Sequence, residues 1–349
     1  MRFNISRREF LKAGALSLLA PAGAAVSKNL ASGMTPPQSR TNRQDGGHGH
    51  SSMGTVGRVD HQANRFHPVE MLYDFDYGHI STLPGGQTLR EYEFWAVDRE
   101  VEIAPGVFFP AWVYGSPTSP ESQRLRAAGG GDFVGRVPGP SIRCVEGDRI
   151  RIKFINAGSH PHTIHFHGIH HISMDGVPGA GDGLIFPGES TVYEFDAAPF
   201  GCHLYHCHAL PLKRHVHKGL YGAFIVDPDP EKYTGEEREI AKTRNHLYPE
   251  NKDVHEMMML MNGFDTNFDG GNEVYAVNSI AFAYMNEPIP VDPEQLQRIY
   301  LINLTEFDPI NSIHIHANFF DYYDHGTTLH PTLKTVDTIM QCQAQRGIL

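Results

Sequence analysis

The sequence is poor in cysteine, in positive charge and in long helical patterns. Its 29 lysines and arginines are outnumbered by 40 aspartates and glutamates, and the formal net charge of −11 argues against nucleic acid or an anionic membrane as the main partner. The 349 residues are enough for two domains with a sizeable core. The chain has four cysteines: Cys144, Cys202, Cys207 and Cys342. In an oxidising compartment some of them could form disulfides, but the sequence does not determine which ones pair.

Residues 1–24 carry the pattern of an export signal. Arg7 and Arg8 lie in SRREFLK and precede a short apolar run, which ends in the small residues AGA. This pattern predicts a twin-arginine signal peptide, and hence a periplasmic or otherwise exported protein. The apolar run is too short and too rich in small residues to span a membrane.

The rest of the chain divides into a leader and two β-rich segments. Residues 25–87 are predicted to be a flexible leader, because they begin with a stretch rich in Gly, Ser, Asn, Gln and Pro without apolar periodicity. Residues 88–228 and 251–349 contain short runs of β-branched and aromatic residues bounded by turn residues, which predicts an all-β protein of sandwiches or barrels. The polar residues 229–250 are interpreted as a linker with one short helix. Each β segment has a strand ending in Asn and a later His-x-His strand, which indicates two copies of one domain type.

Histidine is the unusual residue, with 22 in the chain, and many of them gather in two motifs. The first is SHPHTIHFHG at residues 159–168, and the second is YHCHALPLKRHVHKGL at residues 205–220. Because side chains alternate between the two faces of a strand, two neighbouring strands would carry four imidazoles on one face. The four are His165, His167, His206 and His208. The other face would carry His162 with Cys207, and His215 could join them from the following loop.

These two groups differ in their metal chemistry. Two histidines and a cysteine thiolate form a trigonal site that selects copper for electron transfer, and its fourth, axial position tunes the potential. Leu220 follows His215 at the place where a weak axial Met would otherwise lie, and because Leu cannot coordinate, we expect a high potential. Imidazoles hold both oxidation states of copper and leave positions open, so the all-histidine face suits copper that binds O2.

Four motifs together resemble those of the multicopper oxidases: PGPSIRCVEGD (138–148), HTIHFHG (162–168), MDGVPG (174–179) and YHCH followed by HVHKGL. SIHIHANFF extends the similarity into the second half of the chain. The resemblance implies cupredoxin-like Greek-key domains with copper as the cofactor. It implies a type 1 copper at His162, Cys207 and His215, with Leu220 as the axial non-ligand. It further implies a trinuclear cluster, with type 2 ligands His165 and His314 and type 3 ligands His167, His206, His208 and His316.

Only two cupredoxin domains fit the length, so the chain is similar to two-domain oxidases with type 1 copper in the first domain. This resemblance implies a homotrimer, in which the cluster is shared between the first domain of one subunit and the second domain of the next. Asp175 in MDGVPG matches the family's acidic residue near the cluster, which implies a proton donor during O–O cleavage. The alternative for Asp175 is a turn residue before Gly176.

The second domain departs from the family pattern. Three His-x-His pairs are found, at 165/167, 206/208 and 314/316, and the cluster needs one more. The missing pair is expected on a late strand of the second domain, but the sequence ends at QCQAQRGIL. We therefore expect a C-terminally truncated chain with an incomplete second sandwich.

The resemblance predicts an oxidase that takes single electrons from a small reducing substrate and reduces O2 to water. Laccase-like oxidation of phenols is the default substrate class, and a metal ion is the alternative. Copper nitrite reductase is a competing function, but its pattern has Asp where this chain has His165 and Ala where it has His208. If the truncated chain cannot assemble the cluster, the alternative function is that of a blue-copper electron carrier or a copper-binding protein. The other histidines are expected around the sites or on the surface: His160, His170, His171, His203 and His217.

Overall fold

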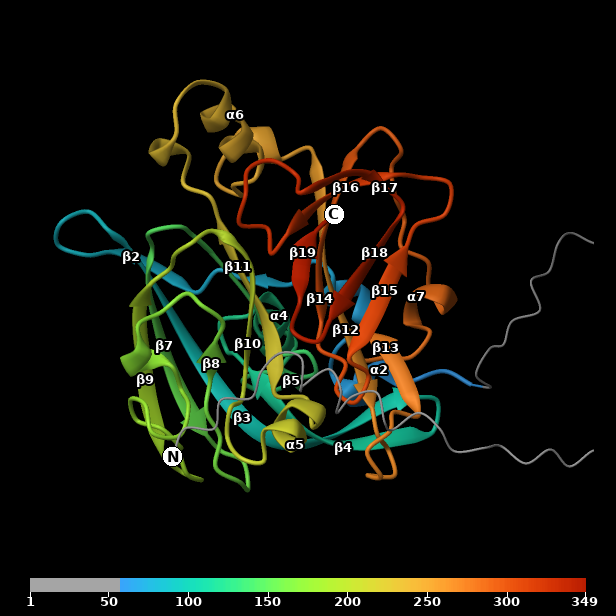
Figure 1. Ribbon diagram of the computed structural model, residues 1–349. Helices are drawn as coiled ribbons and strands as arrows, with labels where there is room; N and C mark the ends of the chain where they lie inside the picture. The colour runs from blue at the N-terminus through green and yellow to red at the C-terminus, as the bar shows by residue number, and fades with distance from the viewer. Residues whose placement is uncertain (1–56) are drawn as a thin grey trace, which may run out of the picture. The chain divides into compact units, whose positions relative to one another are not determined.

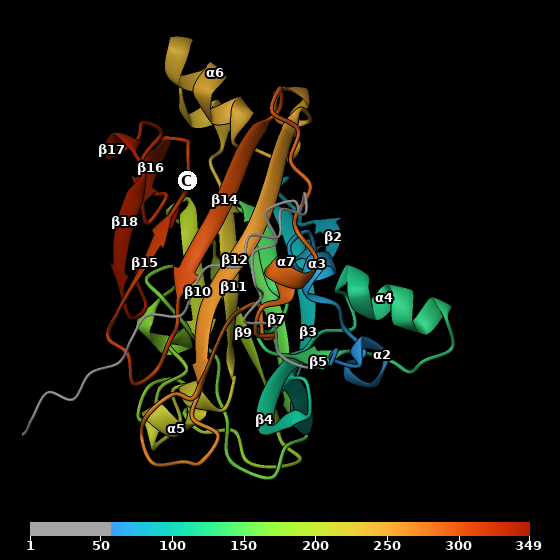
Figure 2. The same cartoon turned by 90° about the vertical axis from the view of Figure 1, so that its right-hand side faces the viewer.

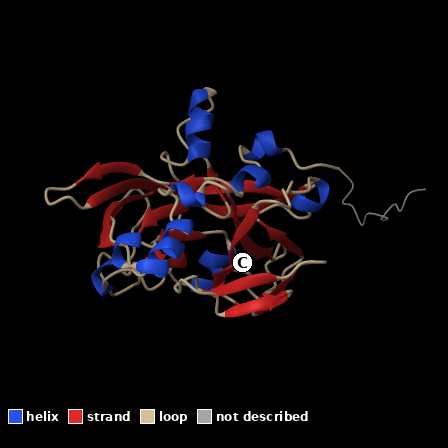
Figure 3. Ribbon diagram, turned by 90° about the horizontal axis from the view of Figure 1, so that it is seen from above, coloured by secondary structure: helices blue, strands red, loops and turns tan. Residues whose placement is uncertain are grey.

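The computed structural model describes residues 57–349. The predicted signal peptide and residues 25–56 of the predicted leader lie outside the described residues. Within the described part, the strands form four sheets, and the helices are short and lie outside them (Figure 1 and Figure 3). The helices are α2 (His61–Asn64), α3 (Pro68–Met71), α4 (Pro120–Ala127), α5 (Leu212–His217), α6 (Gly235–Thr243) and α7 (Ala283–Asn286), with 3-10 helices at Ile172–Met174, Pro230–Lys232 and Pro249–Asn251.

Two sheets make the first sandwich, which corresponds to the predicted first β segment. One sheet has the order β1 (Phe75–Asp76), β6 (Ser141–Val145), β11 (Tyr221–Asp227), β10 (Gly201–His206) and β8 (His165–Phe166). The other has the order β5 (Gly135–Arg136), β4 (Val107–Gly115), β3 (Thr88–Ala104), β7 (Arg149–Asn156) and β9 (Ser190–Asp196), with β2 (His79–Thr82) paired to β3. The all-β, cupredoxin-like architecture predicted from the sequence is confirmed.

Alternation along the strands explains the core of the first sandwich. In β7, Ile150, Ile152 and Phe154 are fully buried while the intervening basic side chains face outward. The buried face packs against Phe166 and Phe224 of the opposite sheet. A strand with one face in the core and one in water needs this period of two, so the sequence pattern sets which face points inward.

The sheet containing β10 and β11 is covered on both faces. Every residue of β11, YGAFIVD, is buried, which accounts for the continuous apolar run in its sequence. Leu204, Ala223 and Ile225 of this sheet belong to one apolar cluster with Met258 and Ile302 of the second sandwich. Figure 2 shows the long strands of the second sandwich lying beside β10 and β11.

The second sandwich is built from a six-stranded sheet and a two-stranded sheet. The six strands have the order β13 (Val274–Val277), β12 (Val254–Phe264), β14 (Leu296–Asn303), β19 (Arg346–Ile348), β16 (Phe320–Asp324) and β17 (Leu333–Val336). The two-stranded sheet pairs β15 (Ile310–His314) with β18 (Thr338–Cys342). A groove of about 870 Å³ lies along the six-stranded sheet, lined by Leu296, Ile315, Phe319 and Leu349 among others.

A buried ion-pair network joins the two sandwiches. Arg143 on β6 is 1% exposed, and its guanidinium bonds the carboxylates of Asp227 at 3.1 Å and Glu256 at 2.6 Å. Arg298 adds a second bond to Glu256 at 2.8 Å. Burial alone would raise the pKa of Glu256, but the charges and hydrogen bonds of the two arginines lower it to about 2. These four charged side chains therefore connect β6 and β11 of the first sandwich with β12 and β14 of the second.

The predicted flexible leader extends too far, because residues 57–87 are folded. They form α2, α3, β1 and β2, and Phe66, Leu72 and Phe75 are buried. The carbonyl of Leu72 accepts a hydrogen bond from the N–H of Met258, so this segment also contacts the second sandwich. Its elements are two to four residues long, too short to show a period in the sequence, and the prediction failed for that reason.

The segment at residues 229–250, predicted as a linker with one short helix, contains α6 between two 3-10 helices. In the described range 57–349, no helix is long and apolar enough to cross a membrane.

Candidate metal centre

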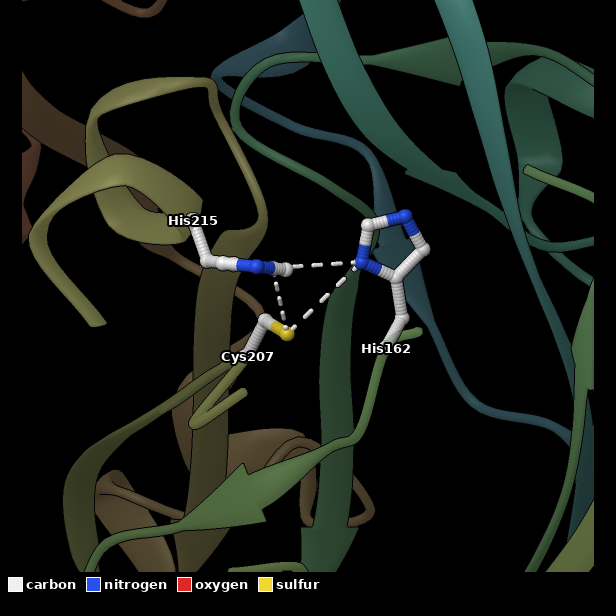
Figure 4. A group of neighbouring side chains, drawn as sticks. All are labelled: His162, Cys207 and His215. Carbon is white, nitrogen blue, oxygen red and sulfur yellow. Dashed lines mark hydrogen bonds between the residues drawn. The ribbon is translucent and has the colours of Figure 1, made fainter. Parts of the chain in front are cut away.

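His162, Cys207 and His215 form one buried group, drawn in Figure 4. Their ligand atoms lie within 4.8 Å of one another. The Cys207 sulfur is 3.3 Å from Nδ1 of His215 and 3.9 Å from Nδ1 of His162, and the two Nδ1 atoms are 3.3 Å apart. The predicted grouping of the sulfur with these two rings is therefore present in the folded chain.

Three different elements bring this group together. His162 follows β7 in a loop that is fastened to Ile185 by two backbone hydrogen bonds. Cys207 comes directly after β10, and its N–H donates to the carbonyl of Leu220, 2.9 Å away. His215 lies in α5, the short helix that closes the loop between β10 and β11.

Leu220 is fully buried and shares an apolar cluster with Cys207. Its side chain has no donor atom, so the surroundings of the sulfur on that part of the site are apolar. An apolar shell of this kind would favour the lower charge state of a copper held by these three residues.

Burial sets the protonation of this group. It raises the pKa of the Cys207 thiol to about 11, against weaker opposing hydrogen bonds from the N–H groups of Ala209 and Thr163. It lowers the pKa of His162 to about 3 and of His215 to about 4, with nearby positive charges adding to the effect. The rings are therefore neutral near pH 7, as a metal ligand must be, and the thiol ionises readily only beside a cation.

Four more imidazoles gather on the other side of the same backbone. β8 and β10 are antiparallel neighbours, with His165 opposite His206, as the strand argument required. In five pairs of neighbouring rings of this group, the ring centroids are 5.0 to 5.7 Å apart. The group consists of His165, His167, His206 and His208.

Hydrogen bonds in this group leave ring nitrogens free for a metal. Nδ1 of His206 donates to the carbonyl of Cys207 at 2.9 Å, which directs its Nε2 to within 2.9 Å of Nε2 of His167. Nδ1 of His165 donates to the carbonyl of Asp175 at 2.7 Å, and Nδ1 of His208 is buried without a hydrogen-bond partner. Burial lowers the pKa of His206 to about 4 and of His167 to about 2. Converging neutral nitrogens fit copper well.

Thr163 connects the two groups and was not singled out from the sequence. Its N–H donates to the Cys207 sulfur at 3.4 Å, and its hydroxyl accepts a hydrogen bond from the N–H of His208 at 2.9 Å. Its carbonyl accepts a hydrogen bond from the hydroxyl of buried Tyr114. A Thr between two histidines gives no signal of this role, because the contacts depend on the crossing of two distant loops.

Asp175 lies beside the four-imidazole group. Its Oδ1 accepts a hydrogen bond from Nε2 of His170 at 2.7 Å and is 3.3 Å from Nδ1 of His165. His170 is thus a neighbour of the four-imidazole group, as expected for the extra histidines.

The other extra histidines lie around the sites or elsewhere in the first sandwich. His160 packs on Trp112, and His203 donates to the Pro199 carbonyl. His217 accepts a hydrogen bond from the Asp265 N–H, and His171 caps a 3-10 helix.

His314 and His316 are not brought to the other histidines. Both are exposed on the second sandwich, with ring centroids 4.8 Å apart. In residues 57–349, no group of three ligand atoms within 4.8 Å includes either of them. Nδ1 of His314 donates to the carbonyl of Asp337 at 2.9 Å, which leaves its Nε2 available. Within one chain, therefore, the predicted cluster has only its first-domain ligands.

Comparisons with known proteins agree with this geometry. A family model described as multicopper oxidase matches residues 131–231. A multicopper oxidase of known crystal structure is 48% identical, with a TM-score of 0.69, and the match covers 84% of this chain and 89% of that chain. The blue copper oxidase from Nitrosomonas europaea is 25% identical, with a TM-score of 0.56 and 74% of each chain covered.

Several curated relatives belong to the competing class, among them copper-containing nitrite reductases from Neisseria that are 36% identical over 28% of this chain and 24% of their own length. A protein named as a probable nitrite reductase-hydroxylamine oxidoreductase fusion, from Kuenenia stuttgartiensis, is 30% identical over 69% of this chain and 26% of its own length. The chain spans 26% or less of the length of the first curated relatives that it matches.

Proposed function

The chain belongs to the multicopper oxidases, and we propose that it couples the one-electron oxidation of a small reducing substrate to the reduction of O2 to water. The observation that carries this proposal is the pairing of two unlike groups on one stretch of backbone. Cys207 belongs to the group with His162 and His215, while its neighbours His206 and His208 belong to the four-imidazole group. Electrons can therefore pass between the groups along covalent bonds.

Copper is the cofactor of this family, and the residues present fit it. His162, Cys207 and His215 would hold the type 1 copper, with Leu220 beside it. His165 would hold the type 2 copper, and His167, His206 and His208 would hold the type 3 pair from the first domain. Bound copper supplies one-electron transfer at the first group and O2 reduction at the second.

The chain's own residues prepare both groups. The Thr163 N–H holds the sulfur at 3.4 Å, and the ring-to-carbonyl bonds of His165 and His206 fix which nitrogen faces the centre. We propose Asp175 as the proton donor; the support is that its Oδ1 lies 3.3 Å from Nδ1 of His165 and accepts a hydrogen bond from His170. In this position the carboxyl group can exchange protons beside the group that reduces O2.

We also propose a homotrimer in which the second domain of one subunit adds His314 and His316, the third of the four His-x-His pairs, to the cluster of the next. The support is the exposure of His314 and His316 and their separation from the first-domain histidines within one chain. Nε2 of His314 is left available by the bond of Nδ1 to the Asp337 carbonyl. In this arrangement a second subunit would bring these two rings to His165 and His167.

Export by the twin-arginine pathway to the periplasm remains a proposal that the sequence of residues 1–24 alone supports. Twin-arginine export carries folded proteins, so the histidine groups could form before the chain crosses the membrane.

Nitrite reduction is the competing function, and two positions disfavour it. His165 and His208 occupy the places of the Asp and Ala in that pattern, and their ring centroids are 5.1 Å apart. Both rings therefore belong to the four-imidazole group, which is larger than a single type 2 copper needs.

Copper content, optical and spin-resonance spectra, and O2 uptake with a phenol test the proposed function on the purified protein. A blue band, a coupled type 3 pair and O2 uptake are expected. Type 1 and type 2 signals with nitrite reduction would establish the competing function instead. A blue band without any catalysis would establish an electron carrier.

A further inference from the structure

A cluster of unpaired positive charge lies next to the His162-Cys207-His215 group. It consists of Lys213 and Arg214 on α5 and of Lys218, which follows that helix. Within residues 57–349, none of these three side chains forms an ion pair with a carboxylate. Lys213 and Arg214 are exposed. A chain with a net charge of −11 thus keeps a local basic surface.

One aromatic ring separates two of these cations, Arg214 and Lys218, from the sulfur-containing group. The Arg214 guanidinium carbon is 5.3 Å from the ring centroid of Trp112, and the Lys218 nitrogen is 5.5 Å from it. The same indole ring lies 4.8 Å from the ring of His215 and 5.3 Å from that of His162. A donor held against the cations would therefore be one ring away from the His215 imidazole.

The nearby acidic groups do not cancel this charge. Asp98 is the carboxylate whose charge reaches Lys218, and it is exposed and accepts a hydrogen bond from the N–H of Ser159. Burial and, to a smaller extent, the charge of Arg214 lower the pKa of Lys218 to about 8, against the opposite effect of Asp98. The ammonium is still mostly protonated at pH 7.

We propose that this basic surface, formed by the exposed Lys213 and Arg214 and reinforced by the charge of the buried Lys218 beside Trp112, receives anionic one-electron donors, such as carboxylated phenols, and disfavours metal cations. The inference rests on the proposed function, because it names the substrate class of the same oxidase. Local positive potential on an acidic molecule concentrates anions and repels cations. The planar indole and guanidinium also match an aromatic donor.

The electron balance is that of the proposed oxidase. Each phenolic donor loses one electron and its hydroxyl proton and leaves as a phenoxyl radical. Four such oxidations supply the electrons that convert one O2 and four protons into two waters.

Two inorganic donors of opposite charge test the proposal on the copper-loaded protein: hexacyanoferrate(II) and hexaammineruthenium(II). Both give up one electron without a proton, so charge is the main difference at the docking step. R214Q should raise the KM for hexacyanoferrate(II) by about threefold to tenfold and lower that for hexaammineruthenium(II). K334Q, at an exposed lysine on β17, is the matched control and should change neither.

A measurement without catalysis separates this inference from the proposed function. Titration calorimetry of the copper-free protein with redox-inert hexacyanocobaltate(III) should show binding that R214Q weakens and K334Q does not. If this binding is found but no donor drives O2 uptake, the surface stands and the proposed oxidase fails. If O2 uptake is found but R214Q changes neither the KM values nor the binding, the anionic-donor surface is overturned and the oxidase stands.

Discussion

Both sandwiches carry a His-x-His strand, yet the surroundings of the two strands differ. His165 begins β8 and His167 follows it, and the neighbouring strand of the same sheet, β10, brings Nε2 of His206 to within 2.9 Å of Nε2 of His167. His314 and His316 stand exposed on the two-stranded sheet of the second sandwich. The same short motif thus makes a converging group in one sandwich and an open pair in the other. The difference shows that a second histidine-bearing strand beside the first is what creates a centre.

The largest effect is expected from removing the sulfur of the first sandwich. C207S should abolish the blue absorption band and reduce donor oxidation by about a thousandfold or more, because serine cannot replace the thiolate at copper. Copper in the four-imidazole group should remain detectable by spin resonance.

C202S is the matched control, since Cys202 is equally buried but is not part of either group. It should keep the blue band. If C202S lost the blue band and C207S kept it, the sulfur that binds copper would be that of Cys202 and not that of Cys207.

The open pair should matter only between subunits. The double variant H314A/H316A should lower the rate of O2 reduction by about a hundredfold or more and leave the blue absorption band intact. Mixed subunits of C207S and H314A/H316A, each inactive alone, should regain O2 uptake when they are assembled together. Failure of every mixture, with trimers present in sedimentation experiments, would contradict a cluster shared between subunits.

The connection between the sandwiches can be broken at Arg143. R143M leaves the buried carboxylates of Asp227 and Glu256 without their main partner, so it should destabilise the protein by about 3–5 kcal/mol. Denaturant unfolding measures this loss. K153M, which removes a surface pair with Glu93, is the control and should cost at most about 1 kcal/mol.

The buried histidines should make the copper-free protein acid-sensitive. The pKa of His206 is about 4 in the folded chain and 6.5 ordinarily, so only the unfolded chain binds its proton between these values. Stability is therefore full above pH 6.5 and falls by about 3 kcal/mol as the pH drops to 4.

H206N should remove this share of the pH dependence in denaturant unfolding of the copper-free protein. H314N, at the exposed pair, should change stability by about 0.5 kcal/mol or less at any pH. Equal pH profiles for wild type and H206N would show that the ring is solvated in solution.

Much of the first sandwich follows from local patterns. The alternation in RIRIKFIN and the continuous apolar run in YGAFIVD predict their strands, and strand alternation places Cys207 on the opposite side from His206 and His208. The fold of residues 57–87 was missed, because its short elements gain their stability from contacts with Met258 and other distant residues. Trp112 and Thr163 were missed as well, since their roles come from contacts with residues far along the chain.

The sequence by itself determined which residues can bind copper and which of them share a side of a strand, because residue type and a period of two are local properties. Only the tertiary structure decided how these residues meet. It set the 3.3 Å between the Cys207 sulfur and His215, the separation of His314 and His316 from the other rings, and the cations around Trp112. These facts depend on which loops and strands become neighbours, and that is settled by packing over the whole chain.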